Sequence, residues 1–169
     1  MYVFQELERM APGRFAVVAS TGIAGLHIGD GTTHAFAGVG LARARWTRSC
    51  TKLASDAAVA RWRAHNFLVV DEVSMLTAFL VDALDAVARV ARGVARPFGG
   101  VRLVFFGDFL QLPPVGLGGG GGSADFAFRA RAWDNARIET CVCFVRALRG
   151  SRPPMTAQMH VRPRTGRGT

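Results

Sequence analysis

Few cysteines and almost no lysine limit what this chain can be. It has three cysteines in 169 residues, at positions 50, 141 and 143, and no second pair at metal-ligand spacing. The sequence therefore indicates neither a disulfide framework nor a zinc site, and a reducing compartment is expected. Lysine occurs once, as Lys52, whereas the other 20 basic residues are arginine. Abundant Arg, Ala and Gly suggest GC-rich codons.

Long apolar runs are also missing. No run reaches the length of a membrane span, and the N-terminus shows no charged segment followed by an apolar one. We therefore expect a soluble, intracellular monomer without a membrane partner, in the nucleus or mitochondrion if the source is eukaryotic.

The charge is large but uneven. The chain carries a formal net charge of +9, of which residues 126–169 contribute +7 and residues 1–125 only +2. Half of the residues are hydrophobic and 20% are charged, which is typical of a chain that folds around a core. The length allows one ordinary domain.

Apolar patterns predict alternating strands and helices. Short apolar runs at 15–19, 67–70 and 101–106 predict buried strands. Helical composition at 50–64 and apolar spacing of three and four over 76–92 predict helices between them. This alternation predicts an α/β fold with a parallel sheet covered on both faces.

The remaining segments set the expected domain boundaries. Residues 1–14 form a lead-in, and residues 15–145 form the domain, with one further strand expected at 138–145. The glycine-rich segment 116–123 predicts a flexible insert. Residues 146–169 have no period and many Arg and Pro, which predicts a disordered basic tail.

Polar residues follow two of the predicted strands, where a parallel sheet binds ligands. Asp71 and Glu72 come directly after the second strand, an arrangement that suits Mg²⁺ binding and activation of water. A strand-end or helix-capping pair is the alternative. Asp108 and Gln111 follow the third strand, and the Gln amide can sense a γ-phosphate. A polar turn with a buried Gln is the alternative there.

Four segments together resemble the petite-integration-frequency (PIF) DNA helicases, relatives of RecD-type helicases in superfamily one. They are ASTGIAG (19–25), HAFAGVG (34–40), VVDEVSML (69–76) and PFGGVRLVFFGDFLQLPPV (97–115). The resemblance implies a partial RecA-like (P-loop NTPase type) parallel sheet flanked by helices. It also implies the first motor domain of an ATP-dependent 5′-to-3′ DNA helicase that serves repair, recombination or the maintenance of telomeres and the genome.

The resemblance implies roles for the residues after the second and third strands. Asp71 matches the Mg²⁺ ligand and Glu72 matches the catalytic carboxylate. Gln111 matches the γ-phosphate sensor, and Asp108 lies in the same nucleotide-binding loop. The cofactors of the parent enzyme would accordingly be ATP and Mg²⁺.

The resemblance also implies contacts with single-stranded DNA. Ser20, Thr21 and Gly22 match a first DNA-contacting loop, and His34 with Phe36 match a second. Hydroxyl and backbone N–H groups bind phosphates, and an aromatic ring can stack on a base. As alternatives, Thr21 caps a helix, and His34 and Phe36 belong to the core.

The sequence departs from the family pattern in several places. It has no GxxxxGK[ST] phosphate-binding motif, and Lys52 has no glycine loop before it. We therefore expect that this chain alone neither binds nor hydrolyses ATP appreciably. Thr33 stands where the family has an apolar residue, and Arg146 lies in a poor match to a family motif, so it receives no role. The family's second RecA-like domain has no counterpart either.

These departures leave more than one hypothesis open. The leading hypothesis is a fragment or truncated gene model of a PIF-type helicase, with a frameshift near residues 140–146. The alternative is a short, non-enzymatic module that binds single-stranded nucleic acid through the two loops and the basic tail. A fragment of a mobile-element helicase is a third possibility.

Overall fold

The structure is a computed structural model that describes residues 9, 12–22, 31–39, 55–111, 114, 125–144 and 155–160. The strands at 139–144 and 155–160 are described by their backbone only. Among these residues, no helix is both long and apolar enough to cross a membrane. The glycine-rich segment 116–123, Lys52 and Arg146 lie outside the described residues.

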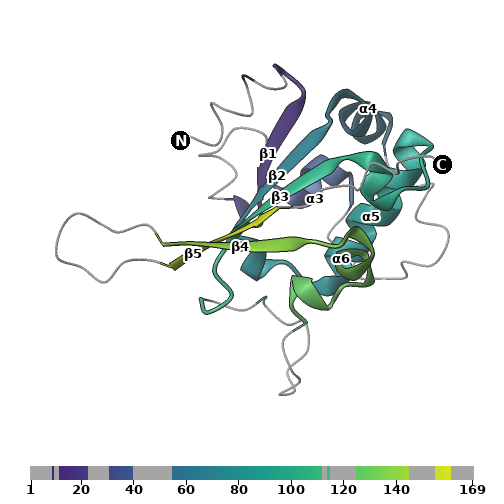
Figure 1. Ribbon diagram of the computed structural model, residues 1–169. Helices are drawn as coiled ribbons and strands as arrows, with labels where there is room; N and C mark the ends of the chain where they lie inside the picture. The colour runs from purple at the N-terminus through teal and green to yellow at the C-terminus, as the bar shows by residue number, and fades with distance from the viewer. Residues whose placement is uncertain are drawn as a thin grey trace, which may run out of the picture.

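A five-stranded sheet in the order β1-β2-β3-β5-β4 forms the centre of the fold (Figure 1). The parallel strands are β1 (Phe15–Ala19), β2 (Phe67–Asp71) and β3 (Arg102–Gly107). All three expected strands are thus confirmed to within one residue at each end. Ala19 pairs with Asp71 in the register, so the loops after β1 and β2 leave the sheet side by side.

The other two strands run antiparallel to their neighbours. The strand expected near 138–145 is confirmed as β4 (Glu139–Phe144), which pairs with β5 (Met155–His160). β5 also pairs with β3. The expectation of disorder beyond residue 145 is therefore wrong for six residues of the tail. The segment MTAQMH alternates apolar and polar residues, the period of a strand, but the alternation is too short to stand out among Arg and Pro.

The described helices lie on one side of the sheet in Figure 1. They are α3 (Thr33–Ala37), α4 (Asp56–Ala64), α5 (Ala78–Arg92) and α6 (Arg131–Ala136), with short 3-10 turns η2 (Val73–Met75), η3 (Pro97–Gly100) and η4 (Ala127–Arg129). We expected helices on both faces of the sheet, and the described helices cover one face. On the opposite face, Val17, Val69 and Val104 belong to a separate small cluster.

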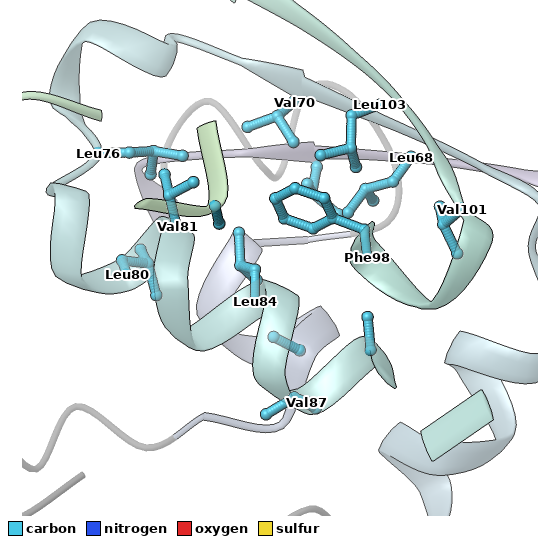
Figure 2. Close-up of a cluster of buried hydrophobic side chains, with 14 of the residues drawn as sticks. Leu68, Val70, Leu76, Leu80, Val81, Leu84, Val87, Phe98, Val101 and Leu103 are labelled. Carbon is cyan, nitrogen blue, oxygen red and sulfur yellow. The ribbon is translucent and has the colours of Figure 1, made fainter. Parts of the chain in front are cut away.

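The main core lies between α5 and the sheet (Figure 2). Thr77 caps the start of α5 by accepting a hydrogen bond from the Leu80 amide, and Gly93 ends the helix in a left-handed conformation. Leu84 of α5 and Leu103 of β3 are fully buried in this core. Each such side chain contributes about 2 kcal/mol through the hydrophobic effect.

The segment PFGG is fastened to α5 by polar contacts. The Asp85 carboxylate accepts hydrogen bonds from the Phe98 amide at 2.6 Å and from Arg89 Nε at 2.9 Å. Arg92 donates to the Gly99 carbonyl at 2.9 Å. Gly99 has a φ of +59°, and a Cβ there would lie 2.5 Å from the Ala88 carbonyl oxygen. The motif therefore needs glycine at this position because the turn packs directly on the helix backbone.

Candidate nucleotide and DNA site

The candidate site lies at the end of the sheet where β1, β2 and β3 terminate, which we call the carboxyl edge. The loops that leave this edge begin at Ser20, Glu72 and Asp108, directly after the three strands. In parallel sheets this edge is where ligands bind, because the loops converge there. All nine residues proposed from the sequence are described by the structure.

Asp71 and Glu72 form a tight turn at the end of β2. Asp71 is the last residue of the strand, and its Oδ1 accepts a hydrogen bond from the Glu72 amide at 3.0 Å. Glu72 has a φ of 55° and a ψ of 48°, the left-handed region that non-glycine residues adopt at a cost of about 1 kcal/mol. This conformation turns the chain into η2, so Asp71 and Glu72 project from a sharp corner rather than a continuing strand.

Asp108 organises the loop after β3. Its Oδ1 accepts from the Leu110 amide at 2.9 Å, and its carbonyl accepts from the Gln111 amide at 3.0 Å. The Gln111 side chain is exposed and donates to Asp108 Oδ2 at 3.4 Å. Gln111 therefore stands at the surface of the carboxyl edge, so the buried-Gln alternative does not apply.

Gly107 brings these two loops together, a role that the sequence did not predict. A Cβ at Gly107 would lie 2.9 Å from the Val73 amide nitrogen and 3.0 Å from Val73 Cγ1. The end of β3 can therefore approach the turn after Glu72 only because residue 107 has no side chain. A glycine between a buried strand and an acidic residue is the sequence signal that points to such close packing.

The electrostatics of Glu72 reflect this convergence. Burial raises the pKa of its carboxyl, and the negative charges of Asp71 and Asp108 raise it further. Asp108, which follows β3, is thus one of the charges that act on Glu72. A base with a raised pKa holds a proton more firmly, which suits a group that takes a proton from water near neutral pH.

The first loop, residues 20–22, is joined to this acidic turn. The Ser20 amide donates to the Asp71 carbonyl at 3.3 Å. Ser20 Oγ is buried and has no hydrogen-bond partner among the described residues. Thr21 is half-buried, whereas Gly22 is exposed, and a Cβ on it would meet nothing within 4 Å.

The second loop, residues 31–34, packs against the end of β1. The Ala19 amide donates to the Gly31 carbonyl at 3.2 Å, and Ala19 forms an isolated parallel bridge with Thr32. Thr33 is fully buried, and its hydroxyl donates to the Ala19 carbonyl at 3.0 Å. The two loops proposed to contact DNA are therefore neighbours in the fold.

His34 and Phe36 differ in how deeply they are buried. His34 is half-buried at the start of α3, and burial lowers the pKa of its imidazole, which favours the neutral form. Phe36 is 3% exposed and packs edge-on against Trp62, with ring centroids 5.1 Å apart. This position supports the core alternative for Phe36, because a ring inside the core cannot stack on a base. A DNA contact by Phe36 stays a prediction.

The donor chemistry of the acidic turn fits a hard cation. Asp71, Glu72 and Asp108 offer oxygen donors, and their mutual repulsion is what a divalent cation relieves. Within the described part of the chain, no group of three or more His, Cys, Asp or Glu side chains could hold a metal ion by itself. Mg²⁺ commonly takes one or two protein carboxylates and completes its shell with water and nucleotide phosphates.

The parallel sheet, its flanking helices and the acidic carboxyl edge define a RecA-like α/β domain. Comparison with known families makes this specific: the model of the PIF1-like helicase family matches residues 2–158. The chain therefore belongs to the PIF1-like helicase family.

Individual relatives agree with this assignment. The ATP-dependent DNA helicase PIF1 of Emericella nidulans is 41% identical over 160 residues, covering 94% of this chain but 21% of the relative. The crystal structure of Pif1 helicase from Candida albicans matches 79% of this chain and 30% of its own, with 38% identity and a TM-score of 0.69. Bacteroides Pif1 in complex with ADP-AlF3 and single-stranded DNA matches 75% of this chain and 31% of its own, with 28% identity and a TM-score of 0.62.

The chain spans about a fifth of the length of the curated relatives that it matches.

Proposed function

We propose that this chain supplies part of the first RecA-like domain of an ATP-dependent 5′-to-3′ DNA helicase. The observation that carries the proposal is the convergence of Asp71 and Glu72 with the Asp108–Gln111 loop at the carboxyl edge. The family membership supports it, and so do the relatives, which are ATP-dependent DNA helicases. Roles in DNA repair, recombination or genome maintenance belong to the same proposal.

On the nucleotide side, each residue has a separate task. Asp71 would hold Mg²⁺, which supplies positive charge to the phosphates during hydrolysis. Glu72 would orient the attacking water and accept its proton, a task that its raised pKa supports. Gln111, exposed and tied to Asp108, would contact the γ-phosphate and signal whether it is present. The phosphate-binding GxxxxGK[ST] motif that these residues require is not in this sequence.

On the DNA side, the first and second loops would bind the backbone of a single strand. Ser20 and Thr21 carry hydroxyls, and exposed Gly22 allows a phosphate to approach the backbone N–H groups closely. His34 would contribute a hydrogen bond rather than a charge, because burial lowers its pKa and favours neutral imidazole.

A chimaera tests the nucleotide side. Residues 15–138 of this chain would replace the matching segment of the Emericella nidulans helicase, and DNA-stimulated ATP hydrolysis would be measured. We expect the chimaera to hydrolyse ATP and Glu72→Gln to lower the turnover number by about 100-fold or more, the usual effect of losing a general base.

The control in the chimaera is Asp125→Asn, which removes an exposed carboxylate outside the proposed site. It should hydrolyse ATP like the parent chimaera. An active chimaera that keeps its turnover with Gln at position 72 would contradict the proposed role of Glu72.

The 169-residue chain itself tests the DNA side. We expect it to bind a fluorescent oligo(dT) without hydrolysing ATP, and we expect Ser20→Ala and Thr21→Val to weaken that binding. Asn135→Ala changes an exposed polar residue of α6, outside both loops, and should leave the Kd unchanged.

One observation favours a second candidate function, a non-enzymatic module for single-stranded nucleic acid. The net charge of +9 is concentrated in residues 126–169. Under this alternative, oligo(dT) binding would fall steeply with salt and would depend on the basic tail rather than on residues 20–22. Loop variants that bind like the wild type would favour it.

A further inference from the structure

Thr33 departs from the family pattern, and the structure shows where its hydroxyl goes. Its side chain is fully buried, and Oγ1 donates a hydrogen bond of 3.0 Å to the carbonyl of Ala19, 14 positions earlier in the chain. A buried hydroxyl that lacks a partner is costly, so this contact fixes both groups firmly. An apolar side chain at this position could not form it.

The second loop forms hydrogen bonds with both the amide and the carbonyl of Ala19. Its amide donates to the Gly31 carbonyl at 3.2 Å, and its carbonyl accepts from Thr33. The next residue, Ser20, donates its amide to the carbonyl of Asp71 at 3.3 Å. A continuous series of hydrogen bonds therefore runs from the second loop through the end of β1 to the acidic turn.

We infer that Thr33 is a positioning residue that sets the first DNA-contacting loop against the second and against Asp71. It touches no reacting group itself and acts through Ala19 and Ser20. The inference rests on the proposed function, because it assumes that residues 20–22 and 31–34 bind single-stranded DNA. The inference assigns to Thr33 one hydrogen bond that fixes the positions of the two loops and of Asp71 relative to one another.

The local geometry explains why a small change at Thr33 would be transmitted. The Thr32 hydroxyl accepts from the Ala35 amide at 3.2 Å and so starts α3, and Arg61 of α4 donates to the Ala35 and Phe36 carbonyls near its end. α3 is thus fixed on the α4 side by bonds that do not involve Thr33. Loss of the Thr33 hydroxyl would leave the end of β1 held to the second loop only by its backbone contacts with Gly31 and Thr32, while α3 stays in place.

The test uses the full 169-residue chain and compares Thr33→Val with Thr33→Ser. Valine keeps the shape but removes the hydroxyl, whereas serine keeps the hydroxyl. We expect Thr33→Val to weaken oligo(dT) binding by about threefold to tenfold, the range that corresponds to one hydrogen bond. Thr33→Ser should restore an affinity close to that of the wild type.

Thr77→Val is the matched control for a merely structural effect. It also removes a threonine hydroxyl that forms a hydrogen bond, in this case the cap of α5 at 3.2 Å from the Leu80 amide, so it should lower the Tm. Because Thr77 belongs to neither loop, the Thr77→Val variant should bind oligo(dT) with the Kd of the wild type. The Ser20 amide belongs to the same peptide group as the Ala19 carbonyl, so its hydrogen exchange should become faster in Thr33→Val and stay slow in Thr77→Val.

The outcomes separate the inference from the proposed function. If Thr21→Val weakens binding but Thr33→Val does not, or if Thr33→Val and Thr77→Val weaken it equally, the positioning role of Thr33 is refuted and the DNA-binding proposal stands. If the wild-type chain binds no oligo(dT), both fall together. Slow exchange of the Ser20 amide in Thr33→Val would also refute the inference.

Discussion

The region where α5 meets η3 and the carboxyl edge of the sheet are built in opposite ways. Around α5, the Asp85 carboxylate and the Arg92 guanidinium meet backbone partners, and Gly99 packs on the helix without a gap. At the carboxyl edge, Glu72 adopts a left-handed conformation, and the buried hydroxyls of Ser20 and Ser74 have no hydrogen-bond partner among the described residues. Phe98 in η3, with a φ of 49°, is left-handed as well, so the two regions differ in hydrogen bonding: the polar groups named around α5 are satisfied, whereas the buried hydroxyls of the carboxyl edge are not.

The difference indicates where stability and function reside. Unsatisfied buried polar groups persist only when the surrounding structure holds them in place, and they call for an explanation such as a functional role. The α5–η3 region supplies that support, because it packs against the same strands whose ends carry Asp71 and Asp108. Changes around α5 should therefore cost stability, whereas changes at the carboxyl edge should cost activity and little stability.

The largest expected effect tests the core of the satisfied region. Leu84 is 0% exposed on α5, and Leu84→Ala should lower the free energy of unfolding by about 4 kcal/mol through lost burial and a residual cavity. Val90 lies on the same helix but is 49% exposed, so Val90→Ala should change stability by about 0.5 kcal/mol or less. Urea unfolding of the 169-residue chain measures both. Equal losses for the two variants would contradict the packing described for α5.

A pair of glycines tests the contact between η3 and α5. Gly99 and Gly93 have similar φ angles of +59° and +65°, but a Cβ on Gly99 would meet the Ala88 carbonyl at 2.5 Å, whereas one on Gly93 would meet nothing within 4 Å. Gly93→Ala should therefore cost about 1 kcal/mol for the left-handed conformation alone. Gly99→Ala should cost about 3 kcal/mol because overpacking is added. Equal costs, measured by urea unfolding, would show that the steric contact contributes nothing.

The sequence predicted the three parallel strands, the long helix and the places of the candidate site residues after the strands, but not the bonds that join the loops. The strands ending at Ala19, Asp71 and Gly107 follow from local apolar runs, and Asp71, Glu72, Asp108 and Gln111 follow from their places after these strands. The Thr33 bond to Ala19 and the packing of Gly107 on Val73 depend on contacts between distant segments. Such contacts leave no local period, and only the departure at Thr33 and the glycine at 107 hinted at them.

The sequence left the burial of Phe36 open. Its motif implied DNA contact with the core as the alternative, and the structure packs its ring inside the core against Trp62. Conversely, Leu110 is apolar but 81% exposed, beside the exposed Gln111, because the Asp108 turn directs this loop away from the core. In the loop of residues 108–111, hydropathy therefore does not indicate which side chains are buried.

The smallest expected effect sharpens the contrast at the carboxyl edge itself. Because burial and the charges of Asp71 and Asp108 raise the pKa of Glu72, ionising it destabilises the folded chain. The group contributes its full stability below its ordinary pKa of 4.5, and this contribution is lost as the pH rises through the higher folded value. Glu72→Gln removes the ionisation, so at pH 7 it should stabilise the fold by up to about 0.5 kcal/mol, a small value because Glu72 keeps contact with solvent.

Thermal unfolding at several pH values measures this stabilisation. The Tm of Glu72→Gln should exceed that of the wild type at pH 7, and the two should converge below about pH 4, where both side chains are neutral. Asp125→Asn removes an equal charge from an exposed position and controls for the net charge of +9. If Glu72→Gln is no more stable than Asp125→Asn at pH 7, the repulsion assigned to the acidic turn is absent. A stabilised variant that has also lost turnover in the chimaera would show that the carboxyl edge gives up stability for catalysis.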